Sequence, residues 1–86
     1  MPIPLCMIYG VTNDNPNHYK AMMTKLLGNC VQDVYICRSD NLYDVLIQFK
    51  SIHRLKNNQE AFSNALNRQT PVILEYNGEK YKIYAA

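Results

Sequence analysis

Very short connections between a strand, a helix and a second strand most constrain the fold of this chain. Residues 5–9 form a continuous apolar run between prolines and a glycine, which is typical of a short strand buried on both faces. A helical pattern follows over residues 16–27, and residues 31–37 are rich in β-branched and aromatic residues. Because few residues separate these segments, we expect a β-α-β unit with parallel strands.

The helix carries the clearest local signals in the chain. Asn15 offers a side chain that can cap the first turn, and Pro16 suits the first helical position, where its missing N–H costs nothing. Gly28 is suited to end the helix, because glycine adopts a left-handed backbone without strain. The spacing between them predicts one buried helical face, made of Tyr19, Met22, Met23, Leu26 and Leu27.

Two patterns compete over residues 42–49. One is a helical face with five apolar residues, Leu42, Val45, Leu46, Phe49 and Ile52. The other is the strict alternation of a half-buried strand, carried by Tyr43, Val45, Ile47 and Phe49. We expect the helix and keep the strand as the alternative, in which residues 38–41 would form a hairpin turn.

A second helix and a β-hairpin are predicted for the rest of the chain. Asn57 and Glu60 form an N-x-x-E arrangement, a variant of the capping box. The inward residues of the helix that follows should be Ala61, Phe62, Ala65 and Leu66. Thr70 and Pro71 then end the helix. Asn77-Gly78 is the strongest short hairpin signal, because both residues tolerate the positive φ of a type I′ turn, so residues 72–76 and 80–84 should pair.

Composition favours one small globular domain over residues 1–86. Of these residues, 48% are hydrophobic and 19% are charged, which is unlike the composition of disordered chains. The net charge of +2 gives no strong field, so we expect neither nucleic acid nor a membrane as a partner. No apolar run approaches the ~20 residues of a membrane span. The first residues also lack the basic start of a secretory signal.

The cysteines point to a reducing compartment. Cys6, Cys30 and Cys37 are odd in number and form no C-x-x-C pair, unlike the even sets of disulfide frameworks. No histidine stands at ligand spacing from them, so we expect no metal site. We therefore expect a cytoplasmic protein, located in the host cytoplasm if the chain is viral.

The order of predicted elements resembles the glutaredoxin branch of the thioredoxin superfamily. Asn15-Pro16-Asn17-His18 stands where that family has its C-P-Y-C loop, and Ala21 follows as in the family. Thr70-Pro71 resembles the family's cis-proline, and Asn77-Gly78 resembles its hairpin turn. The resemblance implies a small α/β fold, a thioredoxin/glutaredoxin-like β-α-β-α-β-β sandwich lacking the last helix. The alternative, with a strand over residues 42–49, is an α+β ferredoxin-like β-α-β-β-α-β domain.

The residues of this loop cannot carry out the thiol exchange that is typical of the family. Thiol exchange requires a thiolate at the helix N-terminus, and Asn15 and His18 replace the two family cysteines. The resemblance therefore implies a scaffold without the redox activity, and we assign no catalytic residue or cofactor. The alternative is a monothiol or glutathione-linked oxidoreductase that uses Cys37, since Cys37 ends its strand near the expected ligand edge.

We therefore expect a redox-inactive module that acts by binding another protein or a second copy of itself, as a viral or accessory regulator. Seven tyrosines are many for a core of this size, and tyrosine is favoured at protein contacts. The binding residues should be Asn15, Asn17, His18, Thr70, Pro71, Tyr76, Tyr81 and Tyr84. His18 could bind an anion together with Asn17 and the helix N–H groups. A ferredoxin-like RNA- or protein-binding domain is a further alternative.

Overall fold

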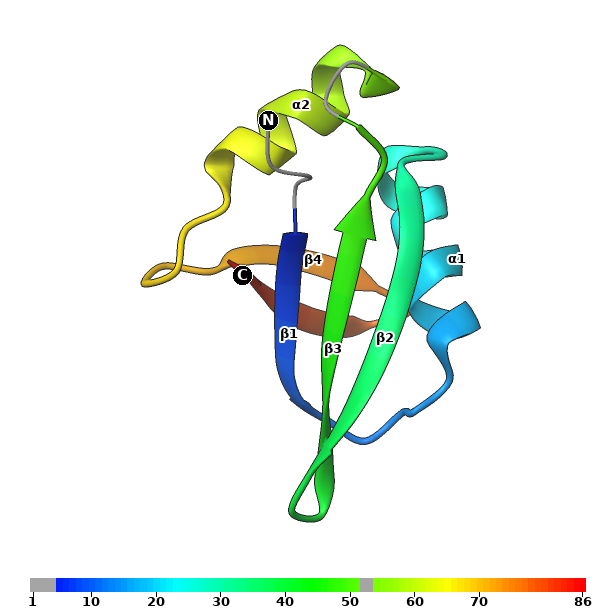
Figure 1. Ribbon diagram of the computed structural model, residues 1–86, viewed down its shortest axis with the longest axis vertical. Helices are drawn as coiled ribbons and strands as arrows, with labels where there is room; N and C mark the ends of the chain where they lie inside the picture. Colours follow the sequence, from blue (N-terminus) through cyan, green and yellow to red (C-terminus); the bar gives the residue numbers. More distant parts are fainter. Residues whose placement is uncertain (1–4, 52–53) are drawn as a thin grey trace.

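A five-stranded antiparallel sheet and two helices make up the fold (Figure 1). The computed structural model describes residues 5–51 and 54–86; residues 1–4, on which the localisation prediction partly depends, and Ile52, which belongs to the predicted helical face, lie outside the described part. The elements in chain order are β1 (Leu5–Val11), α1 (Pro16–Leu27), β2 (Val31–Ser39), β3 (Leu42–Phe49), α2 (Asn57–Ala65), β4 (Val72–Tyr76) and β5 (Glu79–Ala85). The strand order in the sheet is β2-β3-β1-β5-β4.

The predicted limits of α1 are confirmed. The Asn15 side chain accepts a hydrogen bond of 3.0 Å from the Asn17 backbone N–H, and Pro16 is the first helical residue. Gly28 ends the helix with φ 93°, and its N–H donates to the Thr24 carbonyl at 2.9 Å. The helix therefore begins and ends where its local sequence requires.

The predicted buried face of α1 is partly wrong. Tyr19, Met22 and Met23 are buried, whereas Leu27 is half-buried and Leu26 is 37% exposed. Leu27 packs at the margin of the core, whereas Leu26 lies on the outer side of the helix.

Residues 42–49 form strand β3, so the predicted helix is wrong and the alternative is confirmed. β3 pairs with β2 through a tight hairpin in which Ser39 faces Leu42 and Asp40 has φ 55°. Val45, Ile47 and Phe49 are fully buried on one face, as the alternation predicted for a strand. These residues form a strand because β3 lies between β1 and β2, and its backbone pairs with both of them.

The position of β3 also corrects the predicted topology. β3 is antiparallel to both β1 and β2, so these two strands run parallel but are not neighbours. The element order β-α-β-α-β-β is therefore wrong, and the order is that of the alternative β-α-β-β-α-β with one additional strand, β4. The described residues contain no cis peptide bond, so Thr70-Pro71 does not reproduce the family's cis-proline.

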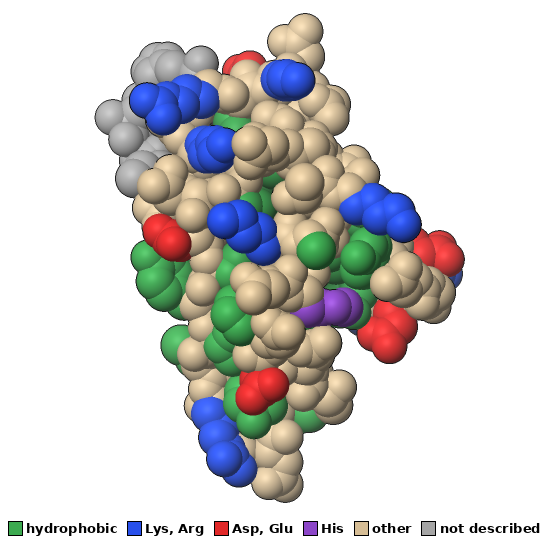
Figure 2. Space-filling model, turned by 90° about the vertical axis from the view of Figure 1, so that its right-hand side faces the viewer, with side chains coloured by type: hydrophobic (Ala, Val, Ile, Leu, Met, Phe, Trp, Pro, Cys, Tyr) green, Lys and Arg blue, Asp and Glu red, His purple; other side chains and the backbone are tan. Residues whose placement is uncertain are grey.

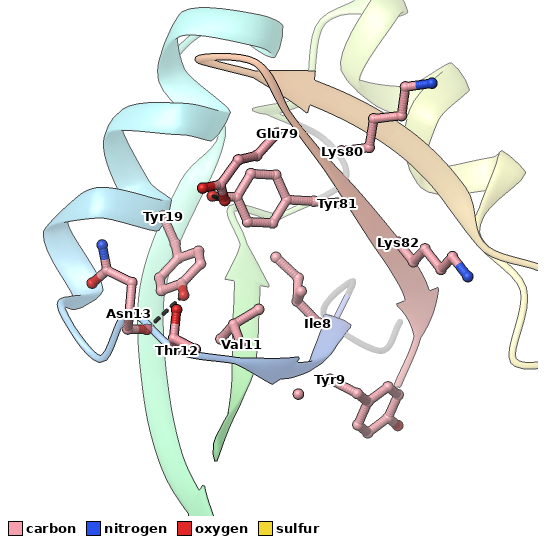
Figure 3. A pocket seen from close by; sticks show the side chains of 11 residues that line it. Ile8, Tyr9, Val11, Thr12, Asn13, Tyr19, Glu79, Lys80, Tyr81 and Lys82 are labelled. Atoms are coloured by element: carbon pink, nitrogen blue, oxygen red, sulfur yellow. Dashed lines mark hydrogen bonds between the residues drawn. The ribbon is translucent and has the colours of Figure 1, made fainter. Parts of the chain in front are cut away.

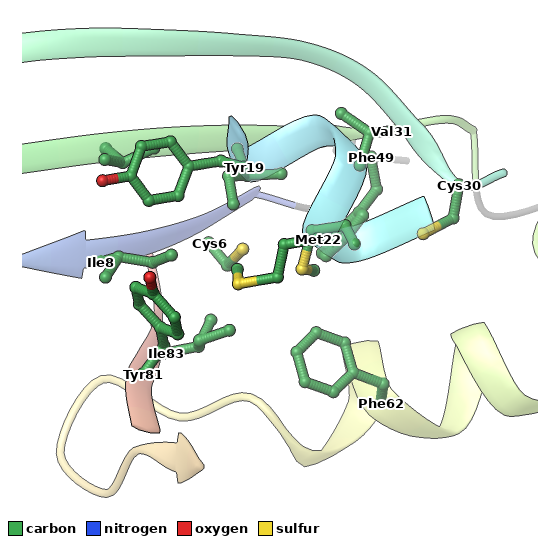
Figure 4. Packing of buried hydrophobic residues seen from close by; sticks show 13 residues of the cluster. Cys6, Ile8, Tyr19, Met22, Cys30, Val31, Phe49, Phe62, Tyr81 and Ile83 are labelled. Atoms are coloured by element: carbon green, nitrogen blue, oxygen red, sulfur yellow. The ribbon is translucent and has the colours of Figure 1, made fainter. Parts of the chain in front are cut away.

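Both helices cover the same face of the sheet. The buried core comes from alternate strand residues and from the helices: Cys6, Ile8, Tyr19, Met22, Met23, Cys30, Val31, Val45, Ile47, Phe49, Phe62, Tyr81 and Ile83. Met22 of α1 and Phe62 of α2 point into this cluster (Figure 4). The prediction that the first strand is buried on both faces is wrong, because Leu5 and Tyr9 are exposed.

The other face of the sheet, termed the open face, has no helix over it. Its apolar side chains alternate with the buried ones along the strands and are Leu5, Met7, Tyr9, Tyr35, Leu42, Leu46, Ile73 and Tyr84. The sheet twists strongly, so that the β4–β5 hairpin crosses behind β1 and β3 (Figure 1). At the hairpin turn, Asn77 has φ 53° and Gly78 has φ 81°, as predicted.

Gln59 joins the two helices, and no sequence pattern indicated it. Its side-chain oxygen accepts from the Lys56 N–H at 3.0 Å, and its side-chain nitrogen donates to the Leu27 carbonyl at 2.8 Å. The predicted capping pair of Asn57 and Glu60 is therefore displaced by one residue. Gln59 is only 4% exposed, so it satisfies the end of α1 and the beginning of α2 inside the protein.

Within the described residues, neither helix has the length and apolar character that crossing a membrane requires.

Candidate functional site

A pocket of about 330 Å³ lies where β1 and β5 separate (Figure 3). The ladder between these strands joins Cys6–Ile8 to Ile83–Ala85. Beyond it, β1 bends away at an irregularity between Ile8 and Val11. The pocket is lined by Ile8, Tyr9, Gly10, Val11, Thr12, Asn13, Tyr19, Glu79, Lys80, Tyr81 and Lys82.

Gly10 makes the bend in β1 possible. Its φ is 67°, a conformation that glycine adopts without strain, and its N–H donates to the Asp44 carboxylate at 3.1 Å. Asp44 belongs to β3, so this bond directs the end of β1 toward β3 and away from β5. The opening that results forms one wall of the pocket.

A chain of hydrogen bonds connects His18, Tyr81 and Glu79 beside this opening. The Tyr81 hydroxyl donates to the Glu79 carboxylate at 3.0 Å, and His18 Nε2 lies 3.1 Å from the same hydroxyl oxygen. Because a phenol has a single proton, His18 Nε2 must be the donor in the second bond. Burial, followed by the hydrogen bond and the charge of Glu79, raises the pKa of Tyr81 to about 12.

Tyr19 completes the wall from the side of α1. Its hydroxyl donates to the Asn13 carbonyl at 2.5 Å, and its ring stands at 87° to the Tyr81 ring. Burial raises the pKa of Tyr19, and the negative charges of Glu79 and Asp14 raise it further. The pocket wall on this side thus carries two phenol hydroxyls and one carboxylate, and Lys80 and Lys82 also line the pocket.

His18 also belongs to an aromatic cluster at the same end of α1. Its ring centroid lies 5.0 Å from that of Tyr19 and 5.8 Å from that of Tyr76, both in edge-to-face geometry. Lys25 Nζ lies 5.8 Å from the centroid of the Tyr76 ring. Figure 2 shows the histidine among hydrophobic side chains, with acidic side chains close by.

Three of the predicted binding residues meet in this cluster. His18, Tyr76 and Tyr81 come from the first helix and the C-terminal hairpin, far apart in the sequence. Tyr81, one of the predicted binding residues, is only 8% exposed and so offers little surface to a partner protein. The geometry also does not favour the predicted anion site. Asn15 accepts from the N–H groups of Asn17 and His18, which are the donors an anion would need.

The other predicted residues lie elsewhere. Thr70 and Pro71 precede β4 and do not line the pocket, and Tyr84 lies on the open face, where its ring packs 5.7 Å from that of Tyr9. Cys37 is exposed on β2 opposite Asp44 and does not line the pocket, and the hydrogen bonds of the Asn15 side chain do not reach it.

Sequence reasoning missed Glu79, Asn13 and Gly10 as site residues, and it placed Tyr19 only in the core. The alternation of Glu79 and Tyr81 along β5 was a usable signal, since it puts both on one face of the strand. Nothing local indicated that the bend at Gly10 would lie opposite β5.

The two buried thiols cannot serve thiol chemistry at neutral pH. Burial, and secondarily Cys30, raises the pKa of the Cys6 thiol to about 12, and burial also raises the pKa of Cys30. No cluster of potential metal ligands occurs among the described residues.

Raising the pH from about 9 toward about 12 should progressively lower the free energy of unfolding. The pKa of Cys6 is higher in the folded state, so the folded protein holds its proton where the unfolded chain has lost it, and stability is complete only below about pH 9. Urea unfolding across this range should show the decline, and Cys6→Ala should flatten it. Cys37→Ala, at an exposed thiol, is the control. An undiminished decline in Cys6→Ala would contradict the prediction.

No protein-family model matches this chain, and the searches of curated proteins and of solved structures returned no match.

Proposed function

We propose that the chain is a redox-inactive binding module that self-associates through the open face of its sheet. The observation that carries this proposal is the distribution of exposed apolar side chains. Six large apolar residues of the described chain are exposed, and all except Leu26 belong to the open face: Leu5, Tyr9, Tyr35, Leu42 and Ile73. Apolar side chains concentrated on one face are typical of a protein interface.

The centre of this face is continuous across four strands. Tyr35 stands opposite Leu46, Leu46 opposite Met7, and Met7 opposite Tyr84, which forms one cross-strand row. Tyr9 extends the row through its contact with Tyr84. Such a row can pack against the same row of a second sheet, as the faces of β-sandwiches do.

Charge supports a second copy as the partner. On the open face, Asp33 and Asp44 lie on the β2–β3 side of the row, and Lys80 and Lys82 lie on the β5 side, where Glu75 of β4 stands opposite Lys80. A two-fold axis in the interface, parallel to the central strands, would place the acidic side of one copy against the basic side of the other. The face is thus self-complementary in charge, which is what an isologous dimer requires.

The fold adds support of a more general kind. The element order β-α-β-β-α-β with an added strand favours assignment as a ferredoxin-like α+β domain over a glutaredoxin-like one. Such sheets commonly use the face opposite the helices for binding. Single-stranded RNA is a second candidate partner, because Tyr9, Tyr35 and Tyr84 could stack on bases. Asp33 and Asp44 stand beside Lys80 and Lys82 on this face, so it presents no continuous basic surface to phosphates, and we favour protein.

Self-association should weaken at least about tenfold in Tyr35→Lys, measured by sedimentation equilibrium over a range of concentrations. The tyrosine is 49% exposed, so the substitution leaves the core intact. Leu26→Lys, on the outer surface of α1, is the matched control and should associate as the unaltered chain does. A monomer at every concentration, or equal weakening by both variants, would overturn the proposal; binding of a single-stranded oligonucleotide by that monomer would favour the RNA alternative.

A charge swap tests the orientation of the two copies. Asp44→Lys and Lys82→Glu should each weaken the dimer, because Asp44 and Lys82 lie near the same level along the strands and each change brings like charges together across the two-fold axis. The double variant should recover most of the affinity, since it restores opposite charges in exchanged positions. Additive weakening in the double variant would contradict the two-fold arrangement.

A further inference from the structure

We propose that the pocket between β1 and β5 binds a small organic cation, with a primary ammonium or guanidinium group directed at Glu79. Binding at this site does not require self-association, but the pocket shares Tyr9, Lys80 and Lys82 with the open face. It is formed by the separation of two neighbouring strands, and its polar groups come from α1, from the loop after β1 and from β5.

The hydrogen bonds already formed in the pocket wall indicate that a ligand beside Glu79 would be a hydrogen-bond donor. The Tyr19 hydroxyl gives its only proton to the Asn13 carbonyl, and the Tyr81 hydroxyl gives its proton to Glu79. The Tyr81 oxygen already accepts from His18, so the Tyr19 oxygen and the Glu79 carboxylate are the acceptors left on this side of the pocket. A ligand group that meets Glu79 and Tyr19 must donate hydrogen bonds, which ammonium and guanidinium groups do and carboxylates do not.

The charges around the pocket agree with a donor of this kind. Glu79 lies in the wall, and its charge reaches both tyrosines, since it raises the pKa of each. The side chains of Lys80 and Lys82 point away from the tyrosine pair (Figure 3), so they do not neutralise Glu79 inside the pocket. A carboxylate in a partly enclosed site attracts a cation more strongly than one in open water.

Aromatic rings add a second attraction for a cation. The Tyr19 and Tyr81 ring centroids are 6.4 Å apart at nearly a right angle, so a group in the pocket can meet a ring face and a ring edge. Cations bind ring faces at up to about 6 Å. Lys25 already lies at such a distance from Tyr76 in the adjoining cluster, so this part of the surface accommodates an ammonium group.

Size limits the ligand to a small molecule. The volume of about 330 Å³ is at the lower end of ligand pockets, which run from about 300 to 1,000 Å³. A cationic head group with a short apolar chain fits, because Ile8 and Val11 supply an apolar wall beside the polar one.

Three probes with the same chain and different head groups test the proposal: n-butylammonium, n-butylguanidinium and butanoate. Each is titrated into the ¹⁵N-labelled protein, and the amide shifts of Gly10, Thr12 and Tyr81 are followed. Both cations should give saturable shifts at these residues, and butanoate should give none. Equal binding of butanoate, or no saturable shift with either cation, would overturn the proposal without any substitution being needed.

The variant Glu79→Gln then tests whether the negative charge of Glu79 attracts the cation. The variant keeps the shape of the side chain and an acceptor for the Tyr81 hydroxyl, and it should bind the cations at least about tenfold more weakly. Glu75→Gln, on the exposed face of β4, removes the same charge outside the pocket and should bind as the unaltered protein does. Unchanged affinity in Glu79→Gln would refute the role of Glu79.

Discussion

Replacing Phe49 with alanine is expected to lower the free energy of unfolding by about 3–5 kcal/mol. Phe49 is 2% exposed, and its ring meets that of Phe62 edge to face at a centroid distance of 6.0 Å. This contact fastens α2 to β3, so the truncation would leave a cavity between a helix and the sheet. Urea unfolding followed by circular dichroism should show the loss, and each kcal/mol should lower Tm by about 4–8 °C in a domain of this size.

The matched control is Leu26→Ala on the outer side of α1. Leu26 is 37% exposed, so its truncation removes little buried surface and should change stability by no more than about 0.5 kcal/mol. If Phe49→Ala cost as little as the control, the packing of α2 on β3 described above would be wrong. The comparison matters because the whole stability of a small domain is only about 5–15 kcal/mol.

Gly28→Ala is expected to destabilise the protein by about 1–3 kcal/mol from backbone strain alone. Gly28 has φ 93° and ψ −174°, a region that is essentially restricted to glycine. A Cβ there would also lie 3.0 Å from the side-chain nitrogen of Gln59. Gln59 would have to move and weaken its bond to the Leu27 carbonyl, which joins α1 to α2. Thermal and urea unfolding would measure the loss.

The variant Gly78→Ala separates the cost of backbone strain from the cost of the steric contact with Gln59. Gly78 also has a positive φ, 81°, but an added Cβ would meet no atom within 4 Å. The substitution at Gly78 therefore reports backbone strain without a steric contact, and Gly28→Ala should cost more. An equal or smaller cost at Gly28 would contradict the importance of the Gln59 contact.

The open face and the cation pocket both depend on the course of β1. This strand pairs with β3 along most of its length but with β5 only over Cys6–Ile8. Its paired part supplies Met7 to the centre of the open face, and its bent part at Gly10 opens the pocket. One strand thus positions both the proposed interface and the proposed cation pocket.

The sequence by itself determined the features that depend on neighbouring residues. The limits of α1 follow from Asn15, Pro16 and Gly28, and the turn at Asn77-Gly78 follows from two residues that tolerate positive φ. These are contacts within one turn of the chain, so they can form before the rest of the fold is in place.

Tertiary structure decided the rest. Residues 42–49 suit either a helix or a strand locally, and they form a strand because β1 and β2 offer backbone partners on both sides. The same holds for the site, in which His18 reaches Tyr81 across 63 residues of sequence and Gln59 reaches Leu27 across 32. Which residues meet in such pairs depends on which strands lie beside β1. Strand pairing joins residues that are distant along the chain, so local propensities cannot predict these pairs.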